Sequence, residues 1–243
     1  MRLPFLKDFI GRFQKTDHHL TMETNSQTED VCVFPLPNVV LLPGVVLPLH
    51  IFEDRYKQMT DEAITTSTPV ALSLSRALPN GEKQNSTICG AGKINIIQYY
   101  PDGRKDVCVE GVKRLKIVEY IQKEPYLKAK ACQLTDIPFA NQILENQYKR
   151  ELSLLAKRWV FLNPDLQDHL MDYVNIFKTP HHLADFIAFY FLPSPKEKQN
   201  LLEMLDCTRR VEKMMGFLEG QIRKFEQQDH TNINHGAPVK ILH

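Results

Sequence analysis

A proline-punctuated apolar run is the sequence feature that most restricts the fold. Residues 34–51 read FPLPNVVLLPGVVLPLHI, with prolines at positions 35, 37, 43 and 48. Proline has no backbone N–H and a fixed φ, so this run is too broken for a helix and suits short strand pieces at sheet edges or bends. Pro43-Gly44 predicts a turn in its middle.

The apolar spacing changes after this run. Four side chains recur at intervals of four, three and four residues: Phe52, Tyr56, Met59 and Ala63. That spacing places them on one face of a helix. Glu53 and Asp54 fall in the first turn, where acidic side chains complement the positive end of the helix dipole. We predict a change from strand to helix near residues 51–53.

Several short motifs occur in a fixed order. The first are Phe34-Pro35-Leu36, Pro43-Gly44 and Phe52-Glu53-Asp54-Arg55-Tyr56. The later ones are Gly90-Ala91-Gly92-Lys93-Ile94, Pro101-Asp102-Gly103-Arg104, Val109-Glu110-Gly111-Val112-Lys113-Arg114 and Leu183-Ala184-Asp185-Phe186-Ile187-Ala188. In these motifs and their spacing, about residues 31–226 resemble the substrate-binding N-terminal domain of Lon proteases.

The resemblance implies a fold and a function. It implies a small PUA-like pseudo-barrel and a non-catalytic polypeptide-binding or adaptor module related to proteolysis, because this domain is not where Lon proteases do chemistry. The sequence lacks the Gly-x4-Gly-Lys-Ser/Thr loop that would cradle phosphates, and it ends before a Lon-type serine-lysine protease domain could begin. We therefore expect a stand-alone protein without ATPase or protease modules.

Residues 31–137 carry mostly strand signals. Val70, Leu72 and Leu74 alternate with Ala71, Ser73 and Ser75, as in a strand with one buried face. Leu78–Ser86 reads as a turn-rich loop, Pro101-Asp102-Gly103 as a hairpin turn, and Gly111 as a bulge or tight bend. About six short antiparallel strands are predicted, forming a barrel or curled sheet on which the helix packs.

From residue 138 the apolar period is helical, so the predicted fold class is α+β, a β-rich lobe followed by an α-helical bundle. The helix signals are, in chain order, an end before Asn163-Pro164, a second helix over about residues 166–177, a start at Thr179-Pro180, a capping box at Ser194-Pro195-Lys196-Glu197 and a cap at Asp206. The predicted divisions are a flexible leader (1–30), the β-rich lobe (31–137), the helical lobe (138–228) and a polar tail (229–243).

Composition excludes several classes of protein. The chain has 30 basic and 29 acidic residues, a formal net charge of +1, so no overall pull toward nucleic acid is present. The longest apolar stretch, Val39–Leu49, is too short to span a membrane. The five cysteines are scattered and odd in number, which argues against a disulfide framework and favours a reducing cytoplasm.

We find no arrangement of residues typical of catalysis. No cysteine pair has the spacing of a zinc knuckle, and His181-His182 lacks a His-Glu-x-x-His pattern, so it is read as a helix start and not as a metal site. The prediction is therefore no enzyme, no catalytic residue, no metal and no cofactor. An unrecognised hydrolase is the third-ranked alternative.

The candidate peptide-binding residues are Leu42, Val45, Val46 and Leu47. A proline-broken run leaves apolar side chains and unpaired backbone groups near a sheet edge, to which extended peptides can add. Alternatively these residues are all core, and the binding surface lies elsewhere. The motif residues Phe52, Glu53, Arg55 and Tyr56 are expected to have structural roles. The expected partners are unfolded or partly folded polypeptides, or a protein partner.

The second-ranked function is a barrel protein that binds a small ligand or nucleic acid. A basic patch with neighbouring aromatic rings would serve nucleic acid. The candidate residues are Lys113, Arg114, Lys116, Lys128 and Lys130, with Tyr99 and Tyr100. Alternation of lysine with small residues is equally typical of an exposed strand face, and nucleic acid is not the expected partner.

Overall fold

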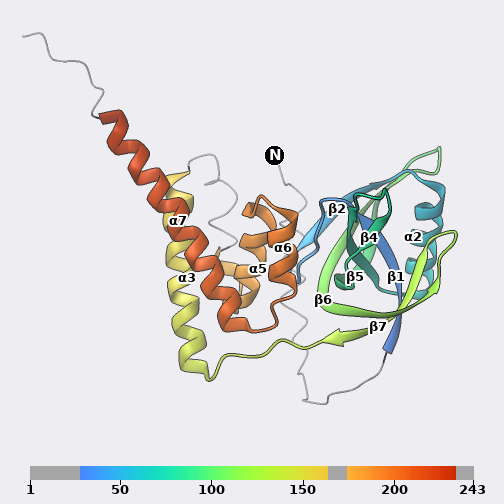
Figure 1. Cartoon of the computed structure of the whole chain (residues 1–243), viewed down its shortest axis with the longest axis horizontal. Helices are drawn as coiled ribbons and strands as arrows, with labels where there is room; N and C mark the ends of the chain where they lie inside the picture. Colours follow the sequence, from blue (N-terminus) through green and yellow to red (C-terminus); the bar gives the residue numbers. More distant parts are fainter. Residues whose placement is uncertain (1–27, 164–173, 234–243) are drawn as a thin grey trace, which may run out of the picture. The chain divides into compact units, whose positions relative to one another are not determined.

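The computed structural model describes residues 28–163 and 174–233 (Figure 1). They form two compact units. The first takes in the described residues up to Pro138 together with Ala184–Cys207, and the second the described parts of Phe139–Leu183 and Thr208–His243. Most of the predicted leader, tail and second helix (166–177) lies outside the described residues. None of the described helices has the length and hydropathy of a membrane span.

A curled sheet is the base of the first unit. Its strands are β1 (Thr28–Leu36), β2 (Val46–Ile51), β3 (Val70–Ala77), β4 (Lys83–Asn85), β5 (Ile88–Tyr99), β6 (Lys105–Gln122) and β7 (Leu127–Leu134). They are ordered β1-β7-β6-β5-β3-β4, with β2 paired to β6. A further pairing of β1 with β3 closes the sheet. Figure 1 shows how strongly its strands curl. The predicted β-rich pseudo-barrel is confirmed.

Two details of the sheet differ from the prediction. The β1–β3 pair is parallel, whereas the other strand pairs in the described residues are antiparallel. A parallel pair needs a long crossover, and the chain between β1 and β3, which includes β2 and a helix, supplies it. The predicted loop Leu78–Ser86 also contains a strand, β4, because its residues pair with the end of β3.

The predicted turns are present. Gly44 has φ 80° and Gly103 has φ 81°, left-handed values that glycine adopts without strain. The Gly103 N–H donates to the Tyr100 carbonyl at 3.0 Å, which closes the β5–β6 hairpin. The predicted irregularity at Gly111 is also confirmed. Ala91 pairs with Lys113 but Gly92 pairs with Gly111, so Val112 is the extra residue of a bulge.

The barrel interior is filled by small and medium-sized apolar side chains. One buried cluster draws on all five strands of the closed ring: Val31, Val33, Ala71, Cys89, Ala91, Leu115, Ile117, Ala129 and Ala131. Alternate residues of a strand point to opposite faces, so Ala71 lies in this cluster while its neighbours Val70 and Leu72 lie in another. The prediction of one buried face for β3 is therefore wrong, since Val70 to Leu74 are all buried.

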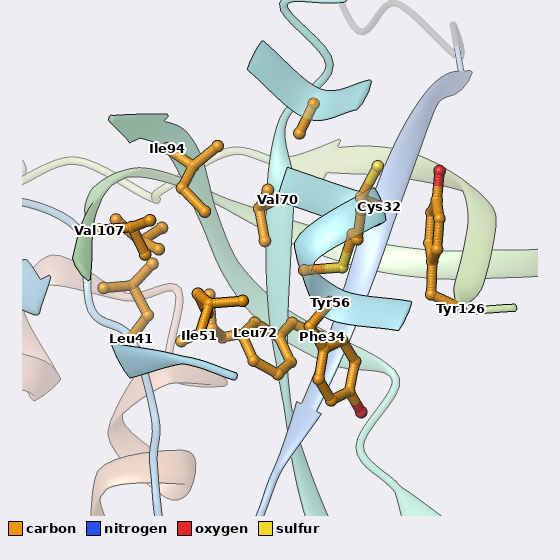
Figure 2. Packing of buried hydrophobic residues seen from close by; sticks show 13 residues of the cluster. Cys32, Phe34, Leu41, Ile51, Tyr56, Val70, Leu72, Ile94, Val107 and Tyr126 are labelled. Carbon is orange, nitrogen blue, oxygen red and sulfur yellow. The ribbon is translucent and has the colours of Figure 1, made fainter. Parts of the chain in front are cut away.

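The second cluster joins the sheet to α2 (Asp54–Thr66), which begins close to the predicted residue. Tyr56, Met59 and Ala63 are buried as predicted. Figure 2 shows the rings of Phe34 and Tyr56 beside each other, with centroids 4.3 Å apart. Phe52 is different from the prediction. It precedes the helix and is 60% exposed.

The apolar run crosses the sheet in direct backbone contact. A Cβ atom at Gly90 would lie 1.8 Å from the Leu41 carbonyl oxygen, and one at Gly111 would lie 2.3 Å from the Leu42 carbonyl oxygen. The Gly44 N–H donates to the Gly111 carbonyl at 2.9 Å, and the Gly111 N–H donates to Val45 at 2.8 Å. Only glycine leaves room for this approach.

A buried ion pair holds residues 184–207 on the sheet. Arg114 of β6 is 3% exposed, and its Nη2 donates to both carboxylate oxygens of Asp185 at 2.8 Å. Its Nε donates to the Leu202 carbonyl at 3.0 Å. Asp185 belongs to α5 (Pro180–Phe191) and Leu202 ends α6 (Pro195–Leu202). The predicted division at 137/138 stays a prediction, and Ala184–Cys207 group with the β-rich unit.

The second unit contains α3 (Gln142–Leu162) and most of α7 (Cys207–Ile233). The Tyr148 hydroxyl of α3 donates to Glu212 of α7 at 2.6 Å. The end of α3 before Asn163 is as predicted, and Ile143 near its start is 79% exposed. α7 runs five residues into the predicted tail, to Ile233.

One local cap is wrong. Ser194 is the N-cap residue of α6, but its side chain makes no capping hydrogen bond. The predicted capping box with Glu197 is therefore not formed. Pro195 at the first helical position fits the prediction, since the missing N–H would be unpaired there in any case.

Replacing Gly90 tests the contact with the apolar run. We expect Gly90→Ala to lower the free energy of unfolding by about 3 kcal/mol or more, because a backbone atom and not a flexible side chain must move. The matched control is Gly216→Ala in α7, where nothing lies within 4 Å of the added Cβ. A stabilisation of about 0.5–1 kcal/mol is expected there. Urea denaturation measures both, and equal effects would contradict the contact.

Asp185→Asn tests the buried ion pair. The buried Arg114 guanidinium would keep only its longer contact with Asp136, at 3.5 Å, so the free energy of unfolding should fall by about 3 kcal/mol. The control is Asp30→Asn, which removes the exposed Lys130–Asp30 pair at 3.2 Å and should change it by less than about 1 kcal/mol. Chemical denaturation of both variants gives the comparison. A loss for Asp185→Asn no larger than for Asp30→Asn would show that the buried pair does not hold the unit together.

Candidate functional site

The predicted peptide-binding residues lie in the core. Leu42, Val45 and Val46 are 0%, 1% and 8% exposed, and Leu47 is half-buried against the cluster under α2. The structure thus places the apolar run where the alternative interpretation expects it. A binding role for these four residues stays a prediction, and an exposed surface has to be sought elsewhere.

The Phe52–Tyr56 motif divides between core and surface. Tyr56 is buried. Arg55 donates to the Glu53 carboxylate at 2.6 and 2.9 Å, and its guanidinium lies 4.5 Å from the centre of the Tyr56 ring. These three residues order the start of α2. Phe52 packs outward, and its ring is available to a partner.

Phe52 is part of a group of rings that we call the aromatic surface: His50, Phe52 and Tyr100. The His50 ring stacks near Phe52 with centroids 6.3 Å apart and meets Tyr100 edge-on at 5.8 Å. The next ring along the hairpin, Tyr99, is 61% exposed. An exposed aromatic group with a polar tip suits contact with apolar segments of another chain.

Asp106 holds the aromatic surface together. Its carboxylate accepts a hydrogen bond from the Tyr100 hydroxyl at 2.6 Å and lies 2.6 Å from His50 Nδ1. These hydrogen bonds, that of Tyr100 foremost, hold the pKa of the Asp106 carboxyl below its ordinary value of 3.8. The same bond raises the pKa of the Tyr100 hydroxyl above 10.0, because the phenol donates to the carboxylate. The rings are thereby fixed at neutral pH.

The aromatic surface borders a sheet edge. Within the described residues β2 pairs with β6 alone, and it carries His50 near its end. Pro48 lies in the middle of β2 and is exposed, and its missing N–H removes one donor from the edge. Backbone edges of this kind accept extended peptides, while proline restrains promiscuous pairing.

The predicted basic patch is largely neutralised. Lys113 pairs with Glu29, Lys128 with Glu62, Lys130 with Asp30, and Arg114 is buried against Asp185. The hydrogen bonds from Lys128 and Tyr126 hold the pKa of Glu62 below its ordinary value. Charges already paired within the chain are poorly available to phosphates. The nucleic-acid interpretation loses its main support.

Comparison with known proteins places the chain in a family. The family model of the ATP-dependent protease La (LON) substrate-binding domain matches residues 30–220. The chain belongs to this family. The Lon protease of Dictyoglomus thermophilum is 25% identical over 208 residues, 83% of this chain and 26% of the relative. That of Rhizobium meliloti is 26% identical over 208 residues, 84% and 26% respectively. The chain thus spans about a quarter of these relatives' length.

Solved structures show the same fold. The N-terminal domain of a Mycobacterium avium complex Lon protease superposes with a TM-score of 0.62 at 21% identity, covering 79% of this chain and 98% of that one. A Lon N-terminal domain protein from Xanthomonas campestris gives 0.55 at 17% identity, covering 77% and 98%. The resemblance to Lon in the sequence motifs is confirmed.

Sequence reasoning missed most of this domain's aromatic surface. It assigned Phe52 to the buried helix face and considered Tyr99 and Tyr100 only beside a basic patch. His50 was not considered. The available signal was the placement of these residues at the end of the apolar run and beside the Pro101-Asp102-Gly103 turn. The pairing of His50 with Asp106 across β2 and β6 brings the two segments together.

Acid should weaken the ties of the aromatic surface. The unfolded chain binds a proton at Asp106 near pH 3.8, whereas the folded chain does so only at lower pH. The contribution of Asp106 to stability is therefore present above pH 3.8 and lost as the pH falls through the folded-state pKa. Asp106→Asn should lower the free energy of unfolding at pH 6, and its difference from wild type should shrink toward pH 2.5.

Urea denaturation across that pH range measures the difference. The control is Asp54→Asn, whose side chain is 96% exposed and pairs only with Lys57 within the described residues. Its difference from wild type should be small at every pH. A pH-independent deficit for Asp106→Asn would contradict the role of the ionised carboxylate.

Proposed function

We propose that this chain is a non-catalytic polypeptide-binding or adaptor module that binds unfolded or partly folded polypeptides. The observation that carries the proposal is the family match over residues 30–220, a domain described as substrate-binding. We place the protein in the cytoplasm. None of its five cysteines, which all lie within the described residues, forms a disulfide, which supports that placement.

The aromatic surface supplies a physical basis for binding. Burial of apolar area favours association by about 25 cal/mol per Å2, and a Phe52 ring that is 60% exposed has most of its area to contribute. The loss of translational freedom and the ordering of a flexible client offset most of this gain. Affinity of about micromolar strength with little sequence preference is the expected result.

The neighbouring β2 edge adds backbone groups to the apolar contact. Peptides that add to a sheet edge gain main-chain hydrogen bonds whatever their side chains are, which gives tolerance of sequence. Pro48 limits how many such bonds β2 can offer, so the rings have to contribute the larger share. This combination fits a module that recognises exposed apolar segments and not one defined motif.

The test is binding of a permanently unfolded, fluorescently labelled client such as reduced, carboxymethylated lactalbumin. We expect Phe52→Ser to weaken binding about tenfold, since full burial of one phenylalanine side chain is worth about 1.5–3 kcal/mol. The matched control is Ile143→Ser on α3, which removes an apolar side chain that is 79% exposed. Fluorescence anisotropy gives both affinities.

The two variants separate the possible results. Both positions are exposed, so the fold should be retained, which circular dichroism checks. An unchanged affinity for Phe52→Ser would move the binding surface elsewhere. A wild-type protein that does not bind the unfolded client at all would overturn the proposed function.

A further inference from the structure

A polar cavity of about 310 Å3 lies in the first unit, formed by β3, β4, the link to β5, and α6. Its nine lining residues are all polar: Arg76, Gln84, Asn85, Ser86, Thr87, Lys196, Gln199, Asn200 and Glu203. It shares no residue with the aromatic surface. Its size is at the lower end of the roughly 300–1,000 Å3 of small-ligand sites.

Hydrogen bonds fix part of the cavity lining. Gln199 is 2% exposed, and its Nε2 donates to the Ile88 carbonyl at 2.9 Å and to Glu203 at 2.8 Å, which anchors α6 to the start of β5. On the other side the Ser86 N–H donates to Leu74 at 3.0 Å, and the buried Ser73 hydroxyl donates to the Ser86 carbonyl at 2.7 Å. These bonds hold the part of the cavity around Gln199 and Ser86, while Arg76 and Lys196 are exposed and reach it from the surface.

The charge of the lining favours an anion. Arg76 and Lys196 form no ion pair within the described residues, whereas the carboxylate of Glu203 already accepts a hydrogen bond from Gln199. Arg76 lies directly opposite Gln84 in the β3–β4 register, so a guanidinium and an amide stand side by side. Two unpaired cations against one carboxylate leave a site of net positive charge, in which a guanidinium can bind a carboxylate through two hydrogen bonds.

The other lining groups favour a peptide over an inorganic anion or a nucleotide. Gln84 and Asn200 each offer a carbonyl acceptor as well as N–H donors, and a peptide backbone can pair with both. An inorganic anion has acceptors alone, so it would leave the two carbonyl groups unused. No aromatic ring is among the lining residues on which a base could stack. We propose that this cavity binds a side-chain carboxylate of an acidic polypeptide segment, between Arg76 and Lys196. The proposal rests on the polypeptide-binding function and adds a preference for acidic segments to it.

The test uses the whole chain and a short labelled Gly/Ser peptide with a central Glu-Glu pair, amidated at its C-terminus. Its counterpart carries Gln-Gln. We expect the acidic peptide to bind, and Arg76→Gln and Lys196→Gln each to weaken it about 3- to 10-fold. The Gln-Gln peptide should bind the wild-type protein no more tightly than these variants bind the acidic peptide. Lys83→Gln, an exposed lysine of β4 outside the lining, is the matched control and should change affinity less than twofold.

Each outcome decides the proposal. Equal binding of the two peptides, or variants that bind the acidic peptide like wild type, would overturn it. The proposal would also be overturned if the protein bound the two peptides equally and inorganic phosphate displaced both of them completely. The unfolded client separates this site from the proposed function. If Phe52→Ser lost binding of the unfolded client while Arg76→Gln behaved like wild type in every assay, the proposed function would be supported. The acidic-segment site would then be contradicted.

Discussion

The first unit depends on one contact between main chains. The carbonyls of Leu41 and Leu42 lie where side chains of β5 and β6 would otherwise stand, and Gly90 and Gly111 make the space. Prolines on either side prevent the run from joining the sheet as one long strand. The run therefore crosses the sheet, seals the cluster under α2, and delivers β2 to the edge that β6 leaves open. The aromatic surface has its position because of this crossing.

Local sequence patterns correctly predicted the elements that depend on residues close together in the chain. The change of apolar period at Phe52 located α2 and three of its buried residues, and the Pro-Asp-Gly turn located the β5–β6 hairpin. The parallel closure of β1 on β3 could not be found this way, because it joins strands separated by a whole crossover. Local patterns can also mislead. Ser194 carries a local capping signal, but its side chain forms no capping hydrogen bond.

Charged residues were the least predictable part of the candidate site. Arg114 and Lys113 are neighbours in sequence, yet one is buried against Asp185 and the other pairs with Glu29. Alternation along a strand sends them to opposite faces, and their partners come from distant parts of the chain. The cavity next to α6 was missed for the same reason. Arg76 and Lys196 are brought to one site by the return of residues 184–207 to the sheet.

That return makes the first unit discontinuous in the chain. Residues 139–183 are an excursion between two parts of one compact body, so a gene fragment that stops at residue 138 would encode the strands without the segment that neutralises Arg114. Such a fragment would uncover the Arg114 guanidinium and leave it only the longer contact with Asp136, at 3.5 Å. An exchange of either unit would therefore have to respect three chain crossings, at 138/139, 183/184 and 207/208, and not one.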